Sequence, residues 1–326
     1  MSCMRLTGVL AVVLTASFGC TSVHFGRHVM CELSGDVTSA LPPSDGSTLN
    51  IITWNLHGTP TAAPTDERFT KVARTILERR PDFVLLQEVW FRGDADQLAA
   101  HLGTVYRKVD DDVLTQHFFG WLIGFRKSGL LVFRRADSAW AIAGDRSSFV
   151  PFKAAAAKWR VWEMDGLAGK GFQHLEIQSA NRRLIVINTH LQSPYRADED
   201  PFGTARPYEK ERRAQITQLA DFVDEQDATR VAIVIGDFNT FPGDEEVYRT
   251  LGDRFADLTR PESKACRCGT IVDEMGRRHE WIDYVLTRPG AWPAVSVEEL
   301  RLIRSFKTDC PFSDHHGIEV RLRFLP

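Results

Sequence analysis

The sequence predicts an α/β fold in which two β-sheets pack together and helices cover their outer faces. The 326 residues are 43% hydrophobic and 25% charged, a balance typical of a folded globular protein. Many short apolar segments of strand length follow one another, with only a few helical patterns between them. One stretch rich in Ser, Gly, Asp and Pro, Ser34–Thr48, precedes these segments, and no second linker of this kind or internal repeat follows it. The sequence therefore predicts one large domain rather than several small ones.

Runs of Val, Ile and Leu mark the expected strands. In chain order, these strands are Leu49–Asn55, Phe83–Glu88, Gly129–Arg134, His174–Ser179, Leu184–Leu191, Ala232–Ile235, Trp281–Thr287 and Ile318–Phe324.

Two helices are expected between the strands, because apolar residues recur there at helical spacing. Pro81 ends the first helix, and the second begins near Pro207 with charges on its outer face. The expected buried positions are Phe69, Val72, Ala73, Ile76 and Leu77 in the first helix, and Ile216, Leu219, Ala220 and Val223 in the second.

The N-terminal residues are expected to be removed before the domain folds. Leu6–Gly19 is apolar and uncharged, follows Arg5, and is shorter than the roughly 20 residues of a membrane-spanning helix. This pattern fits a secretory signal, and Gly19 directly before Cys20 resembles a lipoprotein signal, with an ordinary signal peptide as the alternative. We therefore expect a signal peptide at 1–19, a tether at 20–48 beginning with a lipidated Cys20, and the folded domain at 49–326. The protein would be a membrane-anchored lipoprotein facing the periplasm or exterior, or otherwise secreted.

Four cysteines remain in the expected exported chain after Cys20. They are Cys31, Cys266, Cys268 and Cys310. Disulfide bonds are the favoured interpretation, because no second close Cys or His pair accompanies Cys266 and Cys268 at zinc-finger spacing. Three pairings of four cysteines are possible, and the sequence does not choose among them.

Polar residues follow or flank the apolar strands at several places. They are Asn55, Gln87-Glu88, Asn188-Thr189-His190, Gly236-Asp237-Phe238-Asn239, Asp283-Tyr284 and Ser313-Asp314-His315-His316. A single such residue usually caps a helix or contacts water. Together, however, oxygen ligands, two histidines and an Asp-x-Asn form a coherent set for Mg²⁺-assisted attack on a phosphate.

The same segments, in this order, resemble the endonuclease/exonuclease/phosphatase superfamily, whose members have the DNase I-like fold. The resemblance covers nearly the whole chain from Leu49 onward. It implies a four-layered α/β sandwich of two packed mixed β-sheets flanked by helices, with the active site at one end of the sheets.

The resemblance also implies a metal site and a catalytic pair. Glu88 corresponds to the principal Mg²⁺ ligand, with Asn55 supporting the metal or the phosphate and Asp314 as a carboxylate near it; Mn²⁺ or another divalent metal could serve instead. His315 corresponds to the general base, and Asp283 to the carboxylate that orients it.

The remaining roles concern the phosphate itself. His190 would donate to a phosphoryl oxygen, while Asp237 and Asn239 would hold the nucleophile or leaving-group side of the phosphorus. These roles agree with the negative charge that develops on the phosphoryl oxygens in the transition state.

Secondary motifs separate the branches of the superfamily. Val234-Ile235 and Thr240 disfavour the inositol-polyphosphate phosphatases, and Val89-Trp90 disfavours the abasic-site endonucleases. Two further segments, Ser128–Phe133 and Lys170-Gly171-Phe172, resemble neutral sphingomyelinases. Lys170 is therefore a candidate substrate contact, with a solvated turn lysine as the alternative.

Aromatic and basic residues bear on the substrate. Trp159 and Trp162, flanked by cations, are candidate lipid contacts, because such rings insert into the headgroup layer of a membrane. A nuclease would need a basic groove, for which Arg182-Arg183, Lys210 and Arg212-Arg213 are the candidates. The formal net charge of −3 argues against non-specific coating of nucleic acid.

We therefore expect an exported, monomeric, Mg²⁺-dependent phosphodiesterase that works at a membrane surface on a sphingomyelin-type phospholipid. A secreted nuclease is the main alternative. A non-enzymatic surface binding module is a remote one, because the chain retains Glu88, His190, Asp237 and His315.

Overall fold

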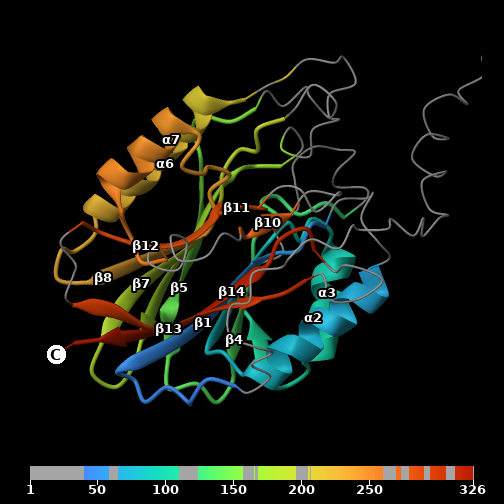
Figure 1. The fold of residues 1–326 in the computed structure, drawn as a ribbon. Helices are drawn as coiled ribbons and strands as arrows, with labels where there is room; N and C mark the ends of the chain where they lie inside the picture. The colour runs from blue at the N-terminus through green and yellow to red at the C-terminus, as the bar shows by residue number, and fades with distance from the viewer. Residues whose placement is uncertain are drawn as a thin grey trace, which may run out of the picture.

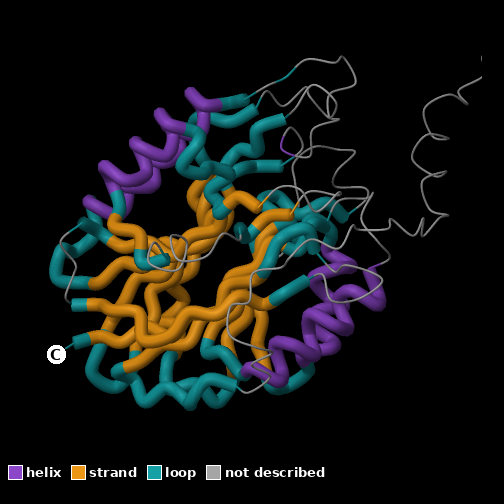
Figure 2. The backbone as a smooth tube through the Cα atoms, in the orientation of Figure 1, coloured by secondary structure: helices purple, strands orange, loops and turns teal. Residues whose placement is uncertain are grey.

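The structure is a computed structural model with two β-sheets at its centre and helices on both outer sides (Figures 1 and 2). It describes residues 40–58, 65–109, 124–156, 165, 168–195, 205, 207–259, 269–272, 279–289, 294–305 and 313–325.

The first sheet has six strands, and its order in space differs from its order in the chain. The spatial order is β13 (Val295–Ile303), β14 (Gly317–Phe324), β1 (Thr48–Asn55), β2 (Phe83–Gln87), β4 (Leu131–Arg135) and β3 (Tyr106–Lys108). β1 and β2 run parallel, whereas the other neighbours run antiparallel, so the sheet is mixed.

The second sheet also has six strands and is mixed in the same way. The spatial order is β5 (Ala141–Pro151), β6 (Gly171–Gln178), β7 (Arg183–His190), β8 (Val231–Asp237), β12 (Asp283–Thr287) and β9 (Ala256–Asp257). Here β7 and β8 form the parallel pair. A small hairpin of β10 (Ile271–Val272) and β11 (His279–Glu280) lies outside both sheets, and Ile271 bridges to His315.

Two pairs of helices form the outer layers. On one side, α2 (Thr65–Arg79) and α3 (Arg92–Leu102) pack against the first sheet through apolar residues such as Ile76 and Leu98. On the other side, α6 (Glu209–Asp224) and α7 (Glu245–Arg254) bury Leu219 and Leu251 against the second sheet. The layers are therefore helix, sheet, sheet, helix, and the predicted four-layered sandwich is confirmed.

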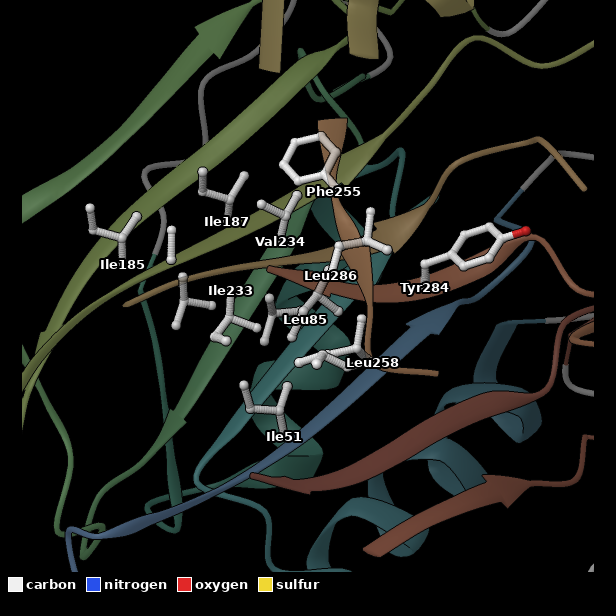
Figure 3. Packing of buried hydrophobic residues seen from close by; sticks show 14 of the residues in the cluster. Ile51, Leu85, Ile185, Ile187, Ile233, Val234, Phe255, Leu258, Tyr284 and Leu286 are labelled. Carbon is white, nitrogen blue, oxygen red and sulfur yellow. The ribbon is translucent and has the colours of Figure 1, made fainter. Parts of the chain in front are cut away.

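The largest apolar core joins the two sheets (Figure 3). Ile51 and Leu85 of the first sheet belong to the same buried cluster as Ile233 and Leu286 of the second. Strands β2, β7 and β8 are buried along nearly their whole length, because each is covered by the other sheet on one face and by helices on the other. This explains why these strands have continuous apolar sequences instead of alternating ones.

All the predicted strands and both predicted helices are present, with ends that differ by a few residues. The sequence analysis missed α3, α7, β3, β5, β13 and the short strands β9 to β11. β13 and β5 are edge strands, and β13 is only partly buried along most of its length, so it lacks a continuous apolar run. α7 has only two buried apolar residues, Val247 and Leu251, which is too few for a clear helical pattern.

Several predictions fall on residues outside the described ranges. They concern the signal peptide, Cys20, Cys31, Cys266, Cys268, Cys310, Trp159 and Trp162. Of the predicted tether, residues 40–48 are described, and Leu41 is buried while the Pro42 carbonyl accepts from Asn50 Nδ2 at 2.9 Å. Among the described helices, none is long and apolar enough to cross a membrane.

Candidate active site

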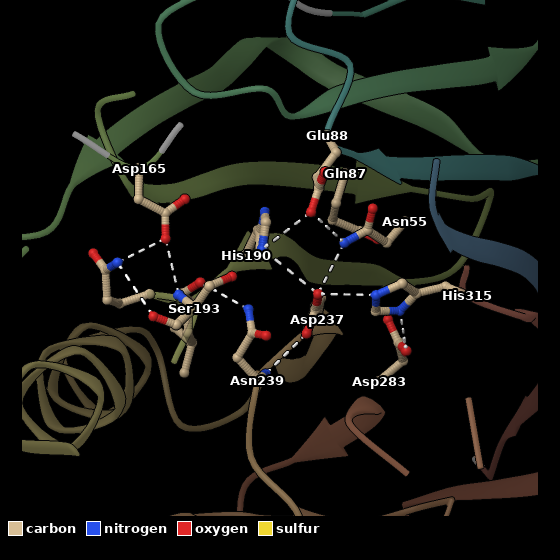
Figure 4. Close-up of polar contacts among 12 residues, drawn as sticks. Asn55, Gln87, Glu88, Asp165, His190, Ser193, Asp237, Asn239, Asp283 and His315 are labelled. Carbon is tan, nitrogen blue, oxygen red and sulfur yellow. Dashed lines mark hydrogen bonds and ion pairs between the residues drawn. The ribbon is translucent and has the colours of Figure 1, made fainter. Parts of the chain in front are cut away.

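The polar residues singled out in the sequence gather at one end of the two sheets (Figure 4). β1, β2, β7 and β8 end there, and β12 and β14 begin there, because each runs antiparallel to a strand that ends at the site. In the second sheet, Asp237 lies directly opposite both His190 on β7 and Asp283 on β12. Strand register alone therefore brings these three side chains together.

His315 and Asp283 form a buried pair. His315 Nδ1 lies 2.8 Å from Asp283 Oδ2, and both side chains are at most 4% exposed. The main chain of Asp283 is fixed by Thr270, whose Oγ1 accepts from the backbone N–H groups of Ile282 and Asp283 at 3.0 and 3.1 Å. With Nδ1 bonded to the carboxylate, Nε2 of His315 faces the rest of the site.

The loop that carries His315 is tied to the first sheet. Ser313 Oγ donates to the carbonyl of Asn55 at 2.6 Å and accepts from the backbone N–H of His315 at 3.0 Å. Trp54 Nε1 donates to the carbonyl of His315 at 3.1 Å. His315 is thus oriented by one sheet through Asp283 and positioned by the other through β1.

Asp237 lies at the centre of the site. Its Oδ2 accepts from Asn55 Nδ2 at 2.9 Å, and its Oδ1 accepts from the backbone N–H of Asn239 at 2.8 Å. The same Oδ2 is 3.5 Å from Nε2 of His190 and 3.7 Å from Nε2 of His315. Burial first, and then the neighbouring Asp283 carboxylate, raise the pKa of Asp237 to about 7.

Asn239 supports Asp237 mainly through its backbone. Its side-chain Nδ2 donates to the carbonyl of Leu191 at 3.1 Å, and its φ of 49° lies in the left-handed region, which Asn tolerates better than most residues. The predicted contact between Asn239 and the phosphorus centre stays a prediction.

Glu88 projects into the site from the residue that follows β2. Its Oε1 accepts from Asn55 Nδ2 at 3.1 Å, and its Oε2 accepts from Trp90 Nε1 at 3.4 Å. Asn55 therefore directs its amide nitrogen at two carboxylates, while its Oδ1 accepts from the backbone N–H of His57 at 2.9 Å. In this arrangement, Asn55 orients Glu88 and Asp237; its predicted role as a direct metal ligand stays a prediction.

His190 is buried but unbonded. It is 2% exposed, and neither ring nitrogen makes a hydrogen bond within the described part of the chain. Burial, followed by the positive charges of Lys170 and His315, lowers the pKa of His190 well below its ordinary value. The ring is therefore neutral at pH 7, and its nearest carboxylate oxygen among the described residues, Asp237 Oδ2, lies 3.5 Å from Nε2.

The protonation of His315 is governed by opposing effects. Burial, the largest single effect, would lower its pKa, but the carboxylates of Asp283, Asp237 and Asp314 together raise the pKa well above its ordinary value.

Asp314 lies at the rim of the site. Its Oδ1 is 3.4 Å from Nδ1 of His57, and both side chains are 34% exposed. The structure thus brings together all eight residues predicted for catalysis and metal binding, with Asp314 as the most accessible of the carboxylates.

The donor set fits a hard divalent cation. Carboxylates converge on the site from four residues, and Asp283 Oδ1 is buried with no hydrogen-bond partner among the described residues. Oxygen ligands of this kind suit Mg²⁺, Mn²⁺ or Ca²⁺ better than a soft metal. Ligand atoms of Asp237, Asp283 and His315 also lie within 4.8 Å of one another. Within this trio, His315 Nδ1 and Asp283 Oδ2 are already bonded to each other.

Lys170 lies behind the site and not at the surface. Its side chain is fully buried, its Nζ is 2.8 Å from Asp165 Oδ1, and it donates to the carbonyl of Leu191 at 2.9 Å. It also lies 5.8 Å from the centre of the Trp90 ring. This placement departs from both sequence interpretations, the direct substrate contact and the solvated turn.

The sequence analysis gave no role to the residues that support the site. Gln87 Nε2 donates to Asn188 Oδ1 at 2.7 Å, and Asn188 Nδ2 donates to the carbonyl of Leu86 at 3.1 Å, so these two amides link the sheets beneath the site. Their position beside Glu88 and His190 in the motifs was the available signal. No local pattern identifies Thr270, because its partners are set by the tertiary fold.

Comparisons with known proteins agree with this geometry. Residues 52–315 match the model of the Endonuclease/Exonuclease/phosphatase family. An inositol phosphosphingolipids phospholipase C of Schizosaccharomyces pombe is 23% identical in a 289-residue alignment that covers 78% of this chain and 63% of that protein. A putative neutral sphingomyelinase of Caenorhabditis elegans is 28% identical over 204 residues, 60% of this chain and 42% of that protein. The chain thus spans less than two thirds of the length of either relative.

Solved structures share the fold at lower identity. A D. rerio TDP2 complexed with single-strand DNA product has a TM-score of 0.63 at 18% identity, covering 85% of this chain and 99% of that one. Sphingomyelinase C from Streptomyces griseocarneus has a TM-score of 0.58 at 19% identity, covering 84% and 99%. The match over residues 52–315 includes every catalytic and metal residue predicted from the sequence, and the chain belongs to the endonuclease/exonuclease/phosphatase family.

Proposed function

We propose that this protein is a divalent-metal-dependent phosphodiesterase that hydrolyses a sphingomyelin-type phospholipid and releases its phosphorylated headgroup. The observation that carries the reaction class is the buried Asp283–His315 pair, 2.8 Å apart, facing Glu88, Asp237 and a neutral His190. For water to attack a phosphodiester, one group must accept the proton of the water. Other groups must stabilise the negative charge that develops on the phosphoryl oxygens, and a neutral N–H donor can do so.

In the proposed reaction, Nε2 of His315 removes a proton from the attacking water, while Asp283 holds the ring and stabilises the imidazolium that forms. The new bond joins the water oxygen to phosphorus, and the bond from phosphorus to the lipid alcohol breaks. The departing alkoxide takes a proton from solvent water to give the free alcohol, and the His315 imidazolium returns its proton to solvent.

His190 would donate its N–H to a phosphoryl oxygen, because burial keeps the ring neutral and no protein group in the described chain accepts from it. A divalent cation held by Glu88, with Asn55 and Asp314 nearby, would supply charge that stabilises the phosphoryl oxygens. Asp237 is held between the two histidines by Asn55 and Asn239, so it fixes the geometry on the nucleophile side.

Support for a lipid substrate comes from the relatives. Both curated relatives are named as phospholipase C or sphingomyelinase, whereas the solved structures of this fold include both a sphingomyelinase and a protein bound to DNA. The fold itself therefore does not discriminate between lipid and nucleic acid.

The basic residues considered for a nuclease groove are partly neutralised. Arg212 is buried and bonds Asp244 at 2.6 Å, and Arg213 pairs with Glu246. These two arginines link α6 to α7, so they are less available for phosphates along a nucleic acid.

The substrate is tested by one parallel assay. Sphingomyelin vesicles, phosphatidylcholine vesicles and plasmid DNA are each incubated with the protein and Mg²⁺, with and without EDTA, and with a His315→Ala variant. We expect release of phosphocholine from sphingomyelin that EDTA and the variant both abolish. Nicking of DNA without phosphocholine release would show that the substrate is nucleic acid.

The location of the protein remains part of the same proposal. A lipid-anchored chain would meet its substrate at a membrane surface, and Trp159 and Trp162 would contact the headgroups. Metabolic labelling with a fatty acid, compared with a Cys20→Ser variant, tests the anchor; label retained by the variant would exclude Cys20.

A further inference from the structure

Trp90 lies directly beside the proposed metal ligand Glu88. Its side chain is 1% exposed, and its Nε1 donates to Oε2 of Glu88 at 3.4 Å. The other carboxylate oxygen, Oε1, accepts from Asn55 Nδ2 at 3.1 Å. Among the described residues, each oxygen of Glu88 thus has one N–H donor, and the two donors come from different segments of the chain.

The Trp90 ring has little freedom to move. It stacks on Phe125, with the ring centres 5.5 Å apart and the planes 8° apart. The backbone at Gly129 also packs against the Trp90 ring. A Cβ atom on Gly129 would lie only 2.5 Å from that ring, so only glycine allows this close approach. The centres of the His190 and Trp90 rings are 6.1 Å apart. Lys170 Nζ lies over the Trp90 ring, 5.8 Å from its centre, in a cation–π contact.

The backbone around Glu88 is held just as firmly. Glu88 has a φ of 58°, in the left-handed region that residues other than glycine rarely adopt. The next residues are bonded to a neighbouring segment, because Val89 N–H donates to the carbonyl of Gly129 at 2.9 Å and Arg126 N–H donates to the carbonyl of Trp90 at 2.6 Å. Fixed backbone and fixed indole together determine where the carboxylate points.

We infer that Trp90 is a positioning residue: its indole N–H and its stacked ring set the orientation of the Glu88 carboxylate for a divalent cation and form the wall beside His190. This inference rests on the proposed role of Glu88 as a metal ligand. A group that fixes a ligand in this way typically changes metal affinity by about 10–100-fold when it is removed.

The test is a calorimetric titration of the apo protein with MgCl₂, in the absence of substrate. Trp90→Phe keeps an aromatic ring but removes the N–H, and we expect it to raise the Kd for Mg²⁺ by about tenfold. Trp140→Phe is the matched control. That tryptophan is also fully buried, its Nε1 donates to the carbonyl of Thr48 at 2.7 Å, and it belongs to the core away from the site. Its Kd should equal that of the wild type.

A second variant covers the case in which Trp90→Phe does not fold. Phe125→Leu leaves the N–H in place but removes the stacking partner, so we expect a smaller rise in Kd, of about threefold, below the roughly 10–100-fold typical of losing the group that bonds the ligand. Equal Kd values for wild type, Trp90→Phe and Trp140→Phe would overturn the inference alone. A wild-type protein that binds no Mg²⁺ would overturn both the inference and the metal-dependent part of the proposed function. A wild-type protein that binds Mg²⁺ but does not hydrolyse sphingomyelin would contradict only the proposed substrate.

Discussion

The two histidines of the site are equally hidden from solvent but differ in their electrostatic surroundings. His315 is 4% exposed and His190 is 2% exposed, and both lie within 4 Å of the same Asp237 oxygen. His315 bonds to Asp283 and its pKa is raised, whereas His190 has no hydrogen bond among the described residues and its pKa is lowered. Burial disfavours charge on both rings, and the neighbouring charges decide the outcome.

This contrast separates two chemical tasks within one small volume. A ring whose protonated form is stabilised by carboxylates can take up a proton and hold it, whereas a ring kept neutral can donate a hydrogen bond without carrying charge. Substitutions at positions 315, 283 and 190 distinguish these two tasks.

The largest effect is expected for His315→Ala. Removing the general base should lower kcat by about 10⁴-fold, measured with saturating substrate and Mg²⁺. His174→Ala is a control substitution of the same kind, because His174 is a partly buried histidine on β6, outside the site. Wild-type turnover by His315→Ala, with an unchanged thermal midpoint, would remove His315 from the mechanism.

A somewhat smaller loss, of about 10³-fold in kcat, is expected for Asp283→Asn. The variant should also shift the pH dependence of kcat/KM. The Asp283 carboxylate raises the pKa of His315, so its loss lowers that pKa, and the base form then persists to lower pH. The acid limb should therefore move to lower pH, whereas an unmoved limb would mean that His315 does not set it.

The donor role of His190 predicts a loss of about 10²-fold for His190→Ala. His190→Gln should retain more activity than His190→Ala, since a neutral amide also offers N–H groups. The same substitution at position 315 should give no such recovery, because an amide does not accept a proton at neutral pH. Equal recovery at both positions, measured as kcat, would erase the distinction between the two histidines.

The smallest effect is expected for Asp94 on α3, a carboxyl group whose pKa is set mainly by burial. Burial raises the pKa of Asp94 to about 6, although the positive charge of Arg68 opposes the rise. The folded state therefore binds this proton more tightly than the unfolded state, so the free energy of unfolding falls as pH rises from about 4 through 6. Asp94→Asn should increase that free energy by on the order of 1 kcal/mol at pH 7.5 and by less at pH 5. Equal gains at both pH values in urea denaturation would argue against this ionisation.

Elements could be predicted from the sequence where their burial requires a recognisable run of neighbouring residues. Strands such as β7 and β8 are covered on both faces, so an unbroken apolar run identifies them, and the polar residue at the end of each run, His190 or Asp237, marks the site. Prediction failed for β13, whose exposed edge position needs no apolar run, and for Lys170, whose burial depends on Asp165 across a loop. The partners of a buried charge come from the tertiary fold, and no window of sequence contains them.

The active-site residues are divided between the two sheets, which meet at the amide pair Gln87–Asn188, so refolding restores activity only when the sheets dock. Glu88 and His315 are attached to one sheet, and His190, Asp237 and Asp283 to the other, while the Gln87–Asn188 hydrogen bond of 2.7 Å crosses between them. Either sheet could acquire its strands separately, yet the site exists only after the two faces dock. Recovered turnover would then report sheet docking, and it should appear later than the far-ultraviolet signal of strand formation.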